Sequence, residues 1–263
     1  MTRQRGYLAK EMAATRILPS HAPFRNRTKQ RPRQPGTVPA HDVLPELAVY
    51  YDALFRAHGA QHWWPGRTRF EVIVGAILTQ CTSWSNVERA ISELRRKKLL
   101  SATAIEKVPL PQLSQLIRSS GYFRQKARKL KAFVQFLRKH HQGSLDKLFA
   151  IPTSALREQL LGVHGIGPET ADSILLYAGK HPVFVVDAYT RRILERHHLV
   201  RGKESYEDIR GLFERSLPPD ASLFNEYHAL IVQTGKHFCR KREPDCGKCA
   251  LRPFLPAAAE VRS

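Results

Sequence analysis

The sequence contains few acidic residues, few cysteines and no long hydrophobic run. No apolar stretch approaches the roughly 20 residues that a helix needs to span a bilayer, and the N-terminus lacks the apolar core of a secretory signal. Only 23 Asp and Glu stand against 43 Lys and Arg, which gives a formal net charge of +20. Three of the four cysteines lie close together, which favours metal binding in a reducing compartment over a disulfide framework. We therefore expect a cytoplasmic protein that does not bind membranes.

The excess of positive charge indicates a polyanionic partner. On charge alone RNA, DNA and an anionic membrane surface fit equally well. Residues 1–40 carry nine Lys and Arg, one acidic residue and five prolines. Such a segment cannot bury enough apolar surface to offset the entropy that it loses on ordering. We predict a disordered basic tail that adds non-specific phosphate contacts; an organellar transit peptide has a similar composition and stays an alternative.

Helical periodicity dominates the rest of the chain. Apolar residues recur at helical spacing in Asp42–His58, Glu204–Ser216 and Phe224–Lys236. The run Val183–Val186 is extended in character, as a strand or as a loop. The sequence predicts an all-α fold with two helical lobes and a cleft between them. The expected parts are an N-terminal helix of the second lobe (41–69), a helical bundle (70–180), a C-terminal lobe with a cysteine-rich loop (181–255) and a short tail (256–263).

One glycine-rich stretch points to a ligand. It begins LGVHGIGPETADSILLYAG, with Gly165 and Gly167 on either side of Ile166. Glycine lets a partner approach the backbone closely, and Pro168 suits the first turn of a helix. Backbone N–H groups at such a helix start suit a phosphate. The pattern predicts a helix-hairpin-helix; a glycine-rich corner without a ligand is the alternative.

A single carboxylate, Asp187, follows the apolar run and precedes a helical pattern. Aspartate is a good helix N-cap, and the helix dipole helps to keep its charge. An ionised carboxylate can stabilise a cationic sugar or orient water, as in glycosidases. Asp187 is therefore a candidate catalytic residue, with a purely structural cap as the alternative.

The stretch LGVHGIGPETADSILLYAG, followed by VFVVDAYTRR, resembles the helix-hairpin-helix/Gly-Pro-Asp superfamily of DNA glycosylases, the endonuclease III family. The resemblance extends from about Asp42 to about Leu255. It implies a base-excision-repair enzyme that flips a damaged or mismatched base out of double-stranded DNA and breaks its N-glycosidic bond. It further implies that the protein acts as a monomer, that Asp187 is catalytic and that Gly165 and Gly167 bind DNA. In a bacterium the enzyme would work at the nucleoid.

One departure from the family bears on the reaction. Bifunctional members carry a lysine at the position of Glu169, and this lysine attacks the sugar to form a Schiff base. Glutamate cannot form an imine, so we predict base removal by water without strand cleavage. The alternatives are a substitute lysine such as Lys180 in a bifunctional glycosylase/AP lyase, and a non-catalytic DNA binder that recognises structure.

A second stretch, WWPGRTRFEVIVGAILTQCTSW, resembles the branch that includes 3-methyladenine DNA glycosylase III. This resemblance implies that Gln80 fills the gap left by the flipped base and that Trp63, Trp64 and Trp84 lie near the base pocket. Stacking on an aromatic ring contributes about 1–3 kcal/mol per base, and an alkylated purine adds a cation–π attraction. We therefore predict alkylated purines as substrates; ordinary core packing is the alternative for Trp63 and Trp64.

The family also places a wedge residue directly after a glycine that corresponds to Gly121. Tyr122 would then push into the duplex and help to eject the base. Lys126 and Arg128 follow in a basic segment and are predicted to contact the DNA backbone. A solvated, amphipathic helix face is the alternative for these cations.

The last motif is a cysteine cluster, HFCRKREPDCGKCALRPFLP. Cys239, Cys246 and Cys249 have the spacing C-x6-C-x2-C. In the family this pattern continues with x5-C and binds a [4Fe–4S] cluster, but here the fourth position is Leu255. Iron–sulfur clusters are normally held by four thiolates. Three possibilities stay open: a cluster with a non-cysteine ligand, a zinc ion with help from His237 or Asp245, and a metal-free loop.

Overall fold

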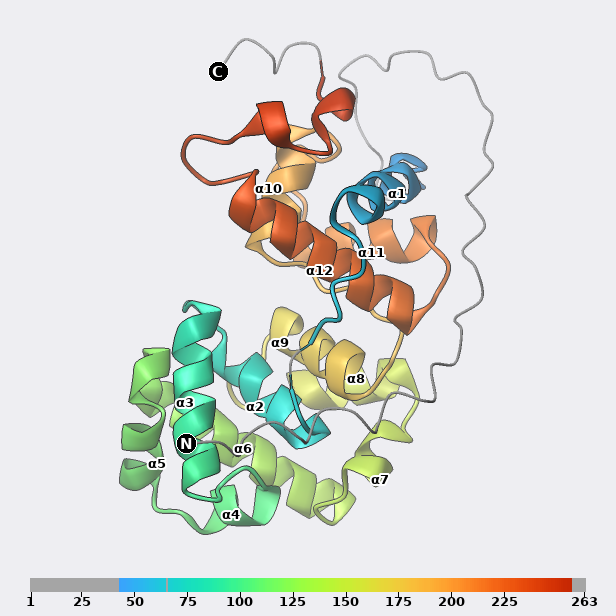
Figure 1. The fold of residues 1–263 in the computed structure, drawn as a ribbon. Coiled ribbons are helices and arrows are strands. Elements are labelled where there is room, and N and C mark those ends of the chain that lie inside the picture. Colours follow the sequence, from blue (N-terminus) through green and yellow to red (C-terminus); the bar gives the residue numbers. More distant parts are fainter. Residues whose placement is uncertain (1–42, 65, 257–263) are drawn as a thin grey trace, which may run out of the picture. The chain divides into compact units, whose positions relative to one another are not determined.

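The computed structural model describes residues 43–64 and 66–256. All regular secondary structure in this part of the chain is helical, without a β-strand, as the sequence predicts (Figure 1). The predicted tail at 1–40 and all but the first residue of the tail at 256–263 lie outside the described residues. No helix in the described ranges is long and apolar enough to cross a membrane.

The helices follow one another with short connections. The longer ones are α1 (Glu46–His58), α2 (Arg69–Leu78), α3 (Trp84–Arg96), α6 (Phe123–His141), α8 (Thr153–Leu161), α10 (Ala188–Arg196), α11 (Tyr206–Ser216) and α12 (Ala221–His237). The shorter ones are α4 (Ala102–Lys107), α5 (Leu110–Leu116), α7 (Leu145–Phe149) and α9 (Pro168–Ser173). Single turns complete the set: η1 (Arg118–Ser120), the π-helical η2 (Ile174–Ala178), η3 (Cys246–Lys248) and η4 (Arg252–Phe254).

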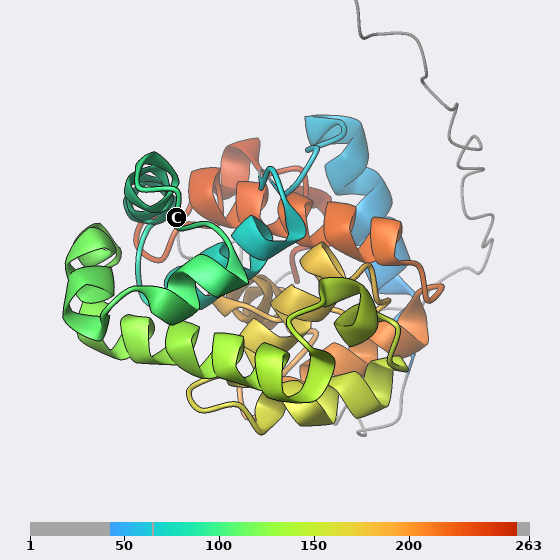
Figure 2. The ribbon, with the colours of Figure 1, turned by 90° about the horizontal axis from the view of Figure 1, so that it is seen from below.

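A first group of helices packs around α2 and α6. Helix α2 is buried from Phe70 to Leu78, as expected for a helix that is apolar on all sides. Its start is fixed by the Thr68 hydroxyl, which accepts a hydrogen bond from the backbone N–H of Glu71 at 3.1 Å. The long helix α6 contacts α2, α4, α5 and α7, and Figure 2 shows it in yellow-green running beneath the helices of this group.

A second group joins the first ordered helix to the last ones. Helix α1 packs against α11 and α12, and α10 packs against α12 (Figure 1). The hydroxyl of Tyr227 on α12 donates to the carbonyl of Leu47 on α1 at 2.8 Å, a buried contact between residues far apart in sequence. Helix α11 begins with a capping box made by Ser205 and Asp208. The numerical domain limits given above stay predictions.

A buried ion pair ties α8, α9 and α11 together. Arg157 Nε donates to Asp172 at 2.7 Å, and its Nη2 donates to Glu207 at 2.6 Å. Asp172 is fully buried. Helix α12 also contacts η2, the turn that continues α9. The segments on either side of the glycine turn are therefore fixed to the helices that carry the C-terminal half of the site.

Candidate active site

The turn between α8 and α9 depends on Gly165. This residue has a left-handed φ of +81°, and a Cβ atom there would lie 2.5 Å from Cγ of Lys129. Gly167 is extended, with a φ of −94° and a ψ of 179°, and nothing lies within 4 Å of its Cβ position. The turn is closed by the N–H of Ile166, which donates to the carbonyl of Val163 at 3.0 Å. Within the protein itself, the left-handed backbone and the packing of the Lys129 side chain require glycine at position 165, whereas neither requires it at position 167.

Asp187 is the N-cap of α10. Its Oδ1 accepts from the backbone N–H of Thr190 at 2.8 Å and from the Thr190 hydroxyl at 3.0 Å. These bonds satisfy a helix-start N–H and fix the rotation of the carboxyl group. The side chain is 14% exposed, so the carboxyl is largely buried but still reaches the surface.

The apolar run before Asp187 is held by side chains of α11 and not by a sheet. The N–H of Phe184 donates to Glu214 Oε1 at 3.0 Å, and the N–H of Val186 donates to the Tyr206 hydroxyl at 3.4 Å. The ring of Phe184 stacks on Phe213 with a centroid distance of 3.7 Å. Val183–Val186 is thus a buried loop that places Asp187 at the start of α10.

The second oxygen of Asp187 faces a buried histidine on α12. Nε2 of His228 lies 3.6 Å from Asp187 Oδ2, and its Nδ1 lies 2.6 Å from the hydroxyl of Tyr177. Burial acts to raise the pKa of Asp187, but His228 and the hydrogen bonds from Thr190 outweigh it and hold this pKa below its ordinary value. Asp187 is therefore an ionised carboxylate at neutral pH.

Glu169 lies at the start of α9, within electrostatic range of Asp187. The residue as a whole is exposed. Partial desolvation and the negative charge of Asp187 act to raise the pKa of Glu169, while His228 acts in the opposite direction. The site thus holds two carboxylates whose surroundings shift their pKa values apart, an arrangement that suits one to stay charged and the other to exchange protons.

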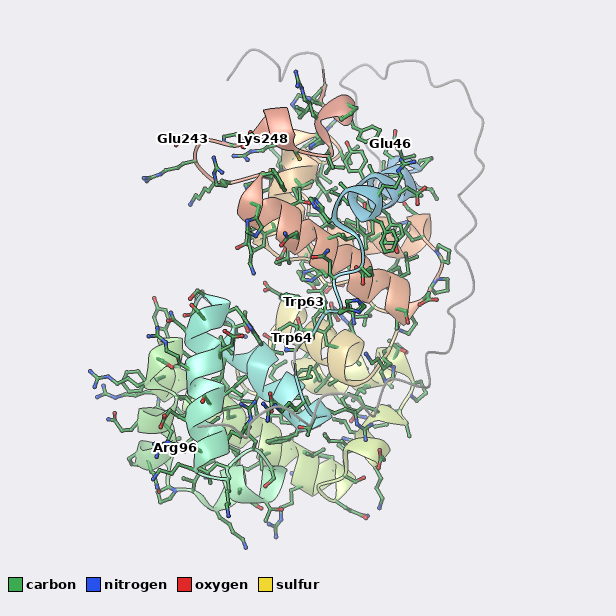
Figure 3. The ribbon with its side chains drawn as sticks, viewed as in Figure 1. Glu46, Trp63, Trp64, Arg96, Glu243 and Lys248 are labelled. Carbon is green, nitrogen blue, oxygen red and sulfur yellow. The ribbon has the colours of Figure 1, made fainter. Side chains whose placement is uncertain are left out.

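The three predicted pocket tryptophans lie together. The ring of Trp64 is 4.9 Å from that of Trp84 in an edge-to-face contact, and 4.8 Å from Tyr177. Trp63 lies 5.5 Å from Trp64, and Nζ of Lys236 stands 5.7 Å from the Trp63 centroid. Figure 3 shows Trp63 and Trp64 on the segment that links α1 to α2. Tyr177 connects this cluster to His228, but contact of these tryptophans with a base stays a prediction.

Gln80 follows α2 and is bound at both ends of its amide. Its Nε2 donates to the hydroxyl of Thr170 on α9, and its Oε1 accepts from Nζ of Lys129 on α6. Gln80 therefore links α9, which follows the glycine turn, to Lys129 of α6, whose side chain packs on that turn. Its insertion into a duplex stays a prediction, and it would require these two hydrogen bonds to change.

Tyr122 projects from the molecule just before α6. It is 68% exposed, and both it and Gly121 have left-handed backbone angles, with φ values of 43° and 67°. A left-handed conformation is unfavourable for a residue with a large side chain. The chain here holds an aromatic ring out into solvent, which is the geometry that a wedge needs.

The predicted contact of Lys126 with the DNA backbone is wrong. Lys126 is 2% exposed, and its Nζ donates to the carbonyls of Leu78 at 2.9 Å and Ser120 at 2.5 Å. Burial lowers the pKa of Lys126 to about 8. Its face of α6 points into the core, which a basic segment of sequence does not reveal. Arg128, two residues on, is exposed, and its contact with DNA stays a prediction.

The cysteine-rich loop packs on the end of α10. Cys239, Cys246, Cys249 and Leu255 all line one small cavity of about 20 Å³. Arg196 of α10 binds the loop, because its Nη1 donates to Cys239 Sγ at 3.2 Å and to the carbonyl of Arg240 at 2.7 Å. The four positions of the family motif are thus brought together, but the fourth carries a leucine. Figure 3 labels Glu243 and Lys248 on this loop.

Comparison with known proteins agrees with this geometry. Residues 74–219, which include the glycine turn and Asp187, match the family described as HhH-GPD superfamily base excision DNA repair protein. The chain belongs to the HhH-GPD superfamily. A protein of Methanocaldococcus jannaschii named as a DNA repair glycosylase is 45% identical over 78% of this chain and 93% of its own length. Endonuclease III of Sulfolobus acidocaldarius is 29% identical over 72% of this chain and 83% of its own.

Two solved structures share the fold. A non-covalent endonuclease III–DNA complex superposes with a TM-score of 0.71 at 22% identity, over 84% of this chain and 99% of that one. An H. pylori 3-methyladenine DNA glycosylase bound to 1,N6-ethenoadenine superposes with a TM-score of 0.62 at 28% identity, over 73% of this chain and 96% of that one.

The donors in the cysteine-rich loop do not fit the four-thiolate cluster that the HhH-GPD resemblance implies. Leu255 offers only methyl groups at the fourth position. His197 lines the same cavity, but its Nδ1 is bonded to the Tyr50 hydroxyl at 2.9 Å. Cys239, Cys246 and Cys249 line one cavity, but within residues 43–64 and 66–256 no three His, Cys, Asp or Glu side chains are already placed around a single metal position.

Sequence reasoning missed two residues of this HhH-GPD site. Thr190 stands three residues after Asp187, and this spacing is the signal of a capped helix start. His228 carried no such signal, because it comes from α12 and only the folded chain brings it to Asp187. Lys129 was expected to contact the DNA backbone, and the structure adds its bond to Gln80.

Proposed function

We propose that this DNA glycosylase of the HhH-GPD superfamily removes a damaged base with water as the nucleophile and leaves the DNA strand intact. The observation that carries the proposal is the geometry of Asp187, a largely buried carboxylate that caps α10 and faces His228, together with a glutamate, Glu169, at the start of α9. Asp187 stabilises the positive charge that develops on the sugar as the base departs. Glu169 occupies the position where bifunctional relatives carry a lysine, and it accepts the proton of the attacking water.

The same chain positions the DNA. The turn at Gly165 and Gly167 grips the backbone phosphates through its N–H groups. Tyr122 enters the duplex, Gln80 takes the place of the extruded base, and Arg128 contacts a phosphate. The exposed, left-handed Tyr122 supports this arrangement most directly. The protein works as a monomer on double-stranded DNA, in the compartment that holds the DNA.

Alkylated purines are the proposed substrates. The supporting observation is the cluster of Trp63, Trp64, Trp84 and Tyr177, whose rings can stack on an extruded base and attract a positively charged one. The similar H. pylori protein, a 3-methyladenine DNA glycosylase, is bound to 1,N6-ethenoadenine.

A bifunctional glycosylase/AP lyase is the second candidate, because relatives at 29% identity are named endonuclease III. Both functions are tested with duplexes that each carry one alkylated, oxidised or mismatched base. Water as the nucleophile predicts strand breaks only after hot alkali and no adduct on borohydride reduction. A trapped protein–DNA adduct in the wild type would establish the lyase instead.

Two variants of the site make the test sharper. Asp187→Asn should abolish base release while DNA binding persists. Glu169→Gln should slow release by about 10²- to 10⁴-fold if Glu169 takes the water's proton, and Glu169→Lys should gain borohydride trapping. Full base release by Asp187→Asn with the DNA still bound would exclude Asp187 as the catalytic group.

A further inference from the structure

His228 is buried and lies between two polar groups. It sits on α12, 5% exposed, and its two ring nitrogens face Tyr177 on η2 and Asp187 at the start of α10. Tyr177 is also buried, at 4% exposed. The proposed function gives His228 no role and Tyr177 only a stacking role, although burying two polar side chains costs free energy unless they are hydrogen-bonded.

The Asp187 carboxylate indicates which tautomer of His228 suits this site. Nδ1 of His228 is 2.6 Å from the Tyr177 hydroxyl, and either atom can be the donor, depending on the tautomer. A carboxylate oxygen only accepts, so the tautomer that suits Asp187 carries its hydrogen on Nε2 and accepts from Tyr177 at Nδ1. Among the described residues Nε2 has no hydrogen-bond partner, and Asp187 Oδ2 lies 3.6 Å away.

Asp187 is complementary to that donor. Its Oδ1 already accepts two hydrogen bonds from Thr190, so Oδ2 is the oxygen left to face His228. Catalytic hydrogen bonds are often long in a free enzyme and shorten when substrate binds. The 3.6 Å separation therefore fits a contact that tightens when positive charge develops next to the carboxylate.

We propose that His228 is a positioning residue for the Asp187 carboxylate, that it acts by donating from Nε2 to Oδ2, and that Tyr177 fixes the orientation of its ring. The proposal rests on the glycosylase function proposed above. Tyr177 has a second contact, because its ring lies 4.8 Å from that of Trp64. The chain Tyr177–His228–Asp187 thus connects the aromatic cluster to the catalytic carboxylate.

The pH dependence of base release can test this role. The titratable groups that interact with Asp187 and His228 are Glu169 from α9 and Tyr177 from η2. His228 holds the pKa of Asp187 low. Because catalysis needs the ionised form of Asp187, loss of the His228 donor should raise that pKa and move the acid limb of the rate profile to higher pH.

The experiment compares His228→Asn with His228→Gln in the full-length protein. The glutamine amide reaches the position of Nε2 and keeps a donor for Asp187, whereas the asparagine amide ends near Nδ1. Single-turnover base release is measured across pH on the duplex that the wild type processes fastest. His228→Asn should lose about 10- to 100-fold in rate at neutral pH, the range expected for one hydrogen bond to a charged group. His228→Gln should lose less, and only His228→Asn should show the full shift of the acid limb.

Tyr177→Phe and Tyr50→Phe form a matched control pair. Each change removes a hydroxyl that bonds Nδ1 of a buried histidine, His228 in one case and His197 in the other, at 2.6 Å and 2.9 Å. Both variants should melt at a lower temperature than the wild type. Only Tyr177→Phe should also slow base release and shift its acid limb.

The outcomes separate this inference from the function on which it rests. An active wild type, an inactive Asp187→Asn and His228 variants with the wild-type rate profile would overturn the role of His228 alone. Equal effects of Tyr177→Phe and Tyr50→Phe on rate, or a loss in His228→Asn with an unmoved acid limb, would reduce His228 to a packing residue. If Asp187→Asn keeps full activity, the catalytic role of Asp187 in the proposed function is rejected, and the role of His228 that rests on it is rejected with it.

Discussion

Lys126 and Arg128 lie two residues apart on α6 and face opposite environments. The Lys126 ammonium is buried against two carbonyls, one at the end of α2 and one just before Tyr122. It therefore joins the backbone near Gln80 to the backbone near Tyr122. Arg128 is exposed and free to reach a phosphate. The two side chains carry the same charge, but Lys126 is buried and Arg128 is exposed.

Replacing Lys126 by Met should destabilise the fold and leave the carbonyls of Leu78 and Ser120 without donors, at a cost of about 1–3 kcal/mol for each. Burial lowers the pKa of Lys126 from 10.5 to about 8. Between these values the unfolded chain binds more protons than the native one, so Lys126 makes wild-type stability rise with pH. Denaturant unfolding from pH 7 to pH 10.5 should show that rise in the wild type and a smaller one in Lys126→Met.

Arg128→Met is the control for this comparison. It should keep the wild-type unfolding curve and its pH dependence but bind duplex DNA more weakly, because it removes a surface cation. The opposite pattern, a stable Lys126→Met with weak DNA binding, would restore the phosphate contact that the sequence suggested.

At the residue scale, the sequence marked as candidates those residues whose immediate neighbours in the chain carry the signal. Asp187 stands between an apolar run and a helix, and the structure makes it a cap with Thr190. His228 lies 41 positions further on in an apolar helix, where nothing nearby in the sequence marks it. Lys126 was misjudged because charge patterning does not tell which side of a helix faces the core.

At the scale of elements, the helical periods predicted helices such as α1, α11 and α12, but they do not show where a helix breaks. The basic segment that carries Lys126 and Arg128 forms α6, and α5 and η1 precede it as separate elements. The break falls at Gly121 and Tyr122, whose left-handed angles end one helix and start the next. The run Val183–Val186 is a loop because α11 supplies acceptors for its N–H groups, a long-range contact that local sequence does not encode.

The glycine turn offers a matched pair of substitutions. Gly165→Ala places a Cβ atom 2.5 Å from the Lys129 side chain and forces alanine into a left-handed backbone, whereas Gly167→Ala meets nothing within 4 Å. Gly165→Ala should therefore cost about 1–3 kcal/mol of stability and Gly167→Ala much less. Thermal or denaturant unfolding of both variants measures the difference, and equal costs would contradict this account of the turn.

The cysteine-rich loop makes a separate prediction. Arg196 bonds to Cys239 and to the carbonyl of Arg240 in this loop, and Leu255 stands at the fourth position of the cluster motif. Wild-type protein reconstituted with iron and sulfide under anaerobic conditions should hold little iron and little visible charge-transfer absorption. Leu255→Cys completes the four-thiolate set and should gain both.

Leu255→Ser is the control, since serine matches cysteine in size without supplying a thiol. Iron content and absorption distinguish the variants without reference to catalysis. A stable, stoichiometric cluster in the wild type would show that three thiolates suffice in this loop.

The whole molecule carries a formal charge of +20, and the distribution of this charge along the chain predicts how the protein binds DNA. Residues 1–40 hold nine Lys and Arg against one Glu, so their removal lowers the formal net charge by eight, from +20 to +12. Binding by neutralised phosphates falls with salt, with a slope of about −0.9 for each phosphate on a logarithmic plot. Because the cations of 1–40 are expected to contribute such contacts, a chain that begins at residue 41 should bind DNA more weakly at low salt and with a shallower slope.

The same truncation should leave the chemical step unchanged, because the carboxylates, the glycine turn and the aromatic cluster all lie within 43–256. Titrations of both proteins with an undamaged duplex at several salt concentrations give the two slopes. Single-turnover base release at saturating protein then isolates the chemistry from the binding. An equal slope for the two proteins would mean that the positive charge of residues 1–40 never reaches the phosphates, and that the folded part alone accounts for the attraction to DNA.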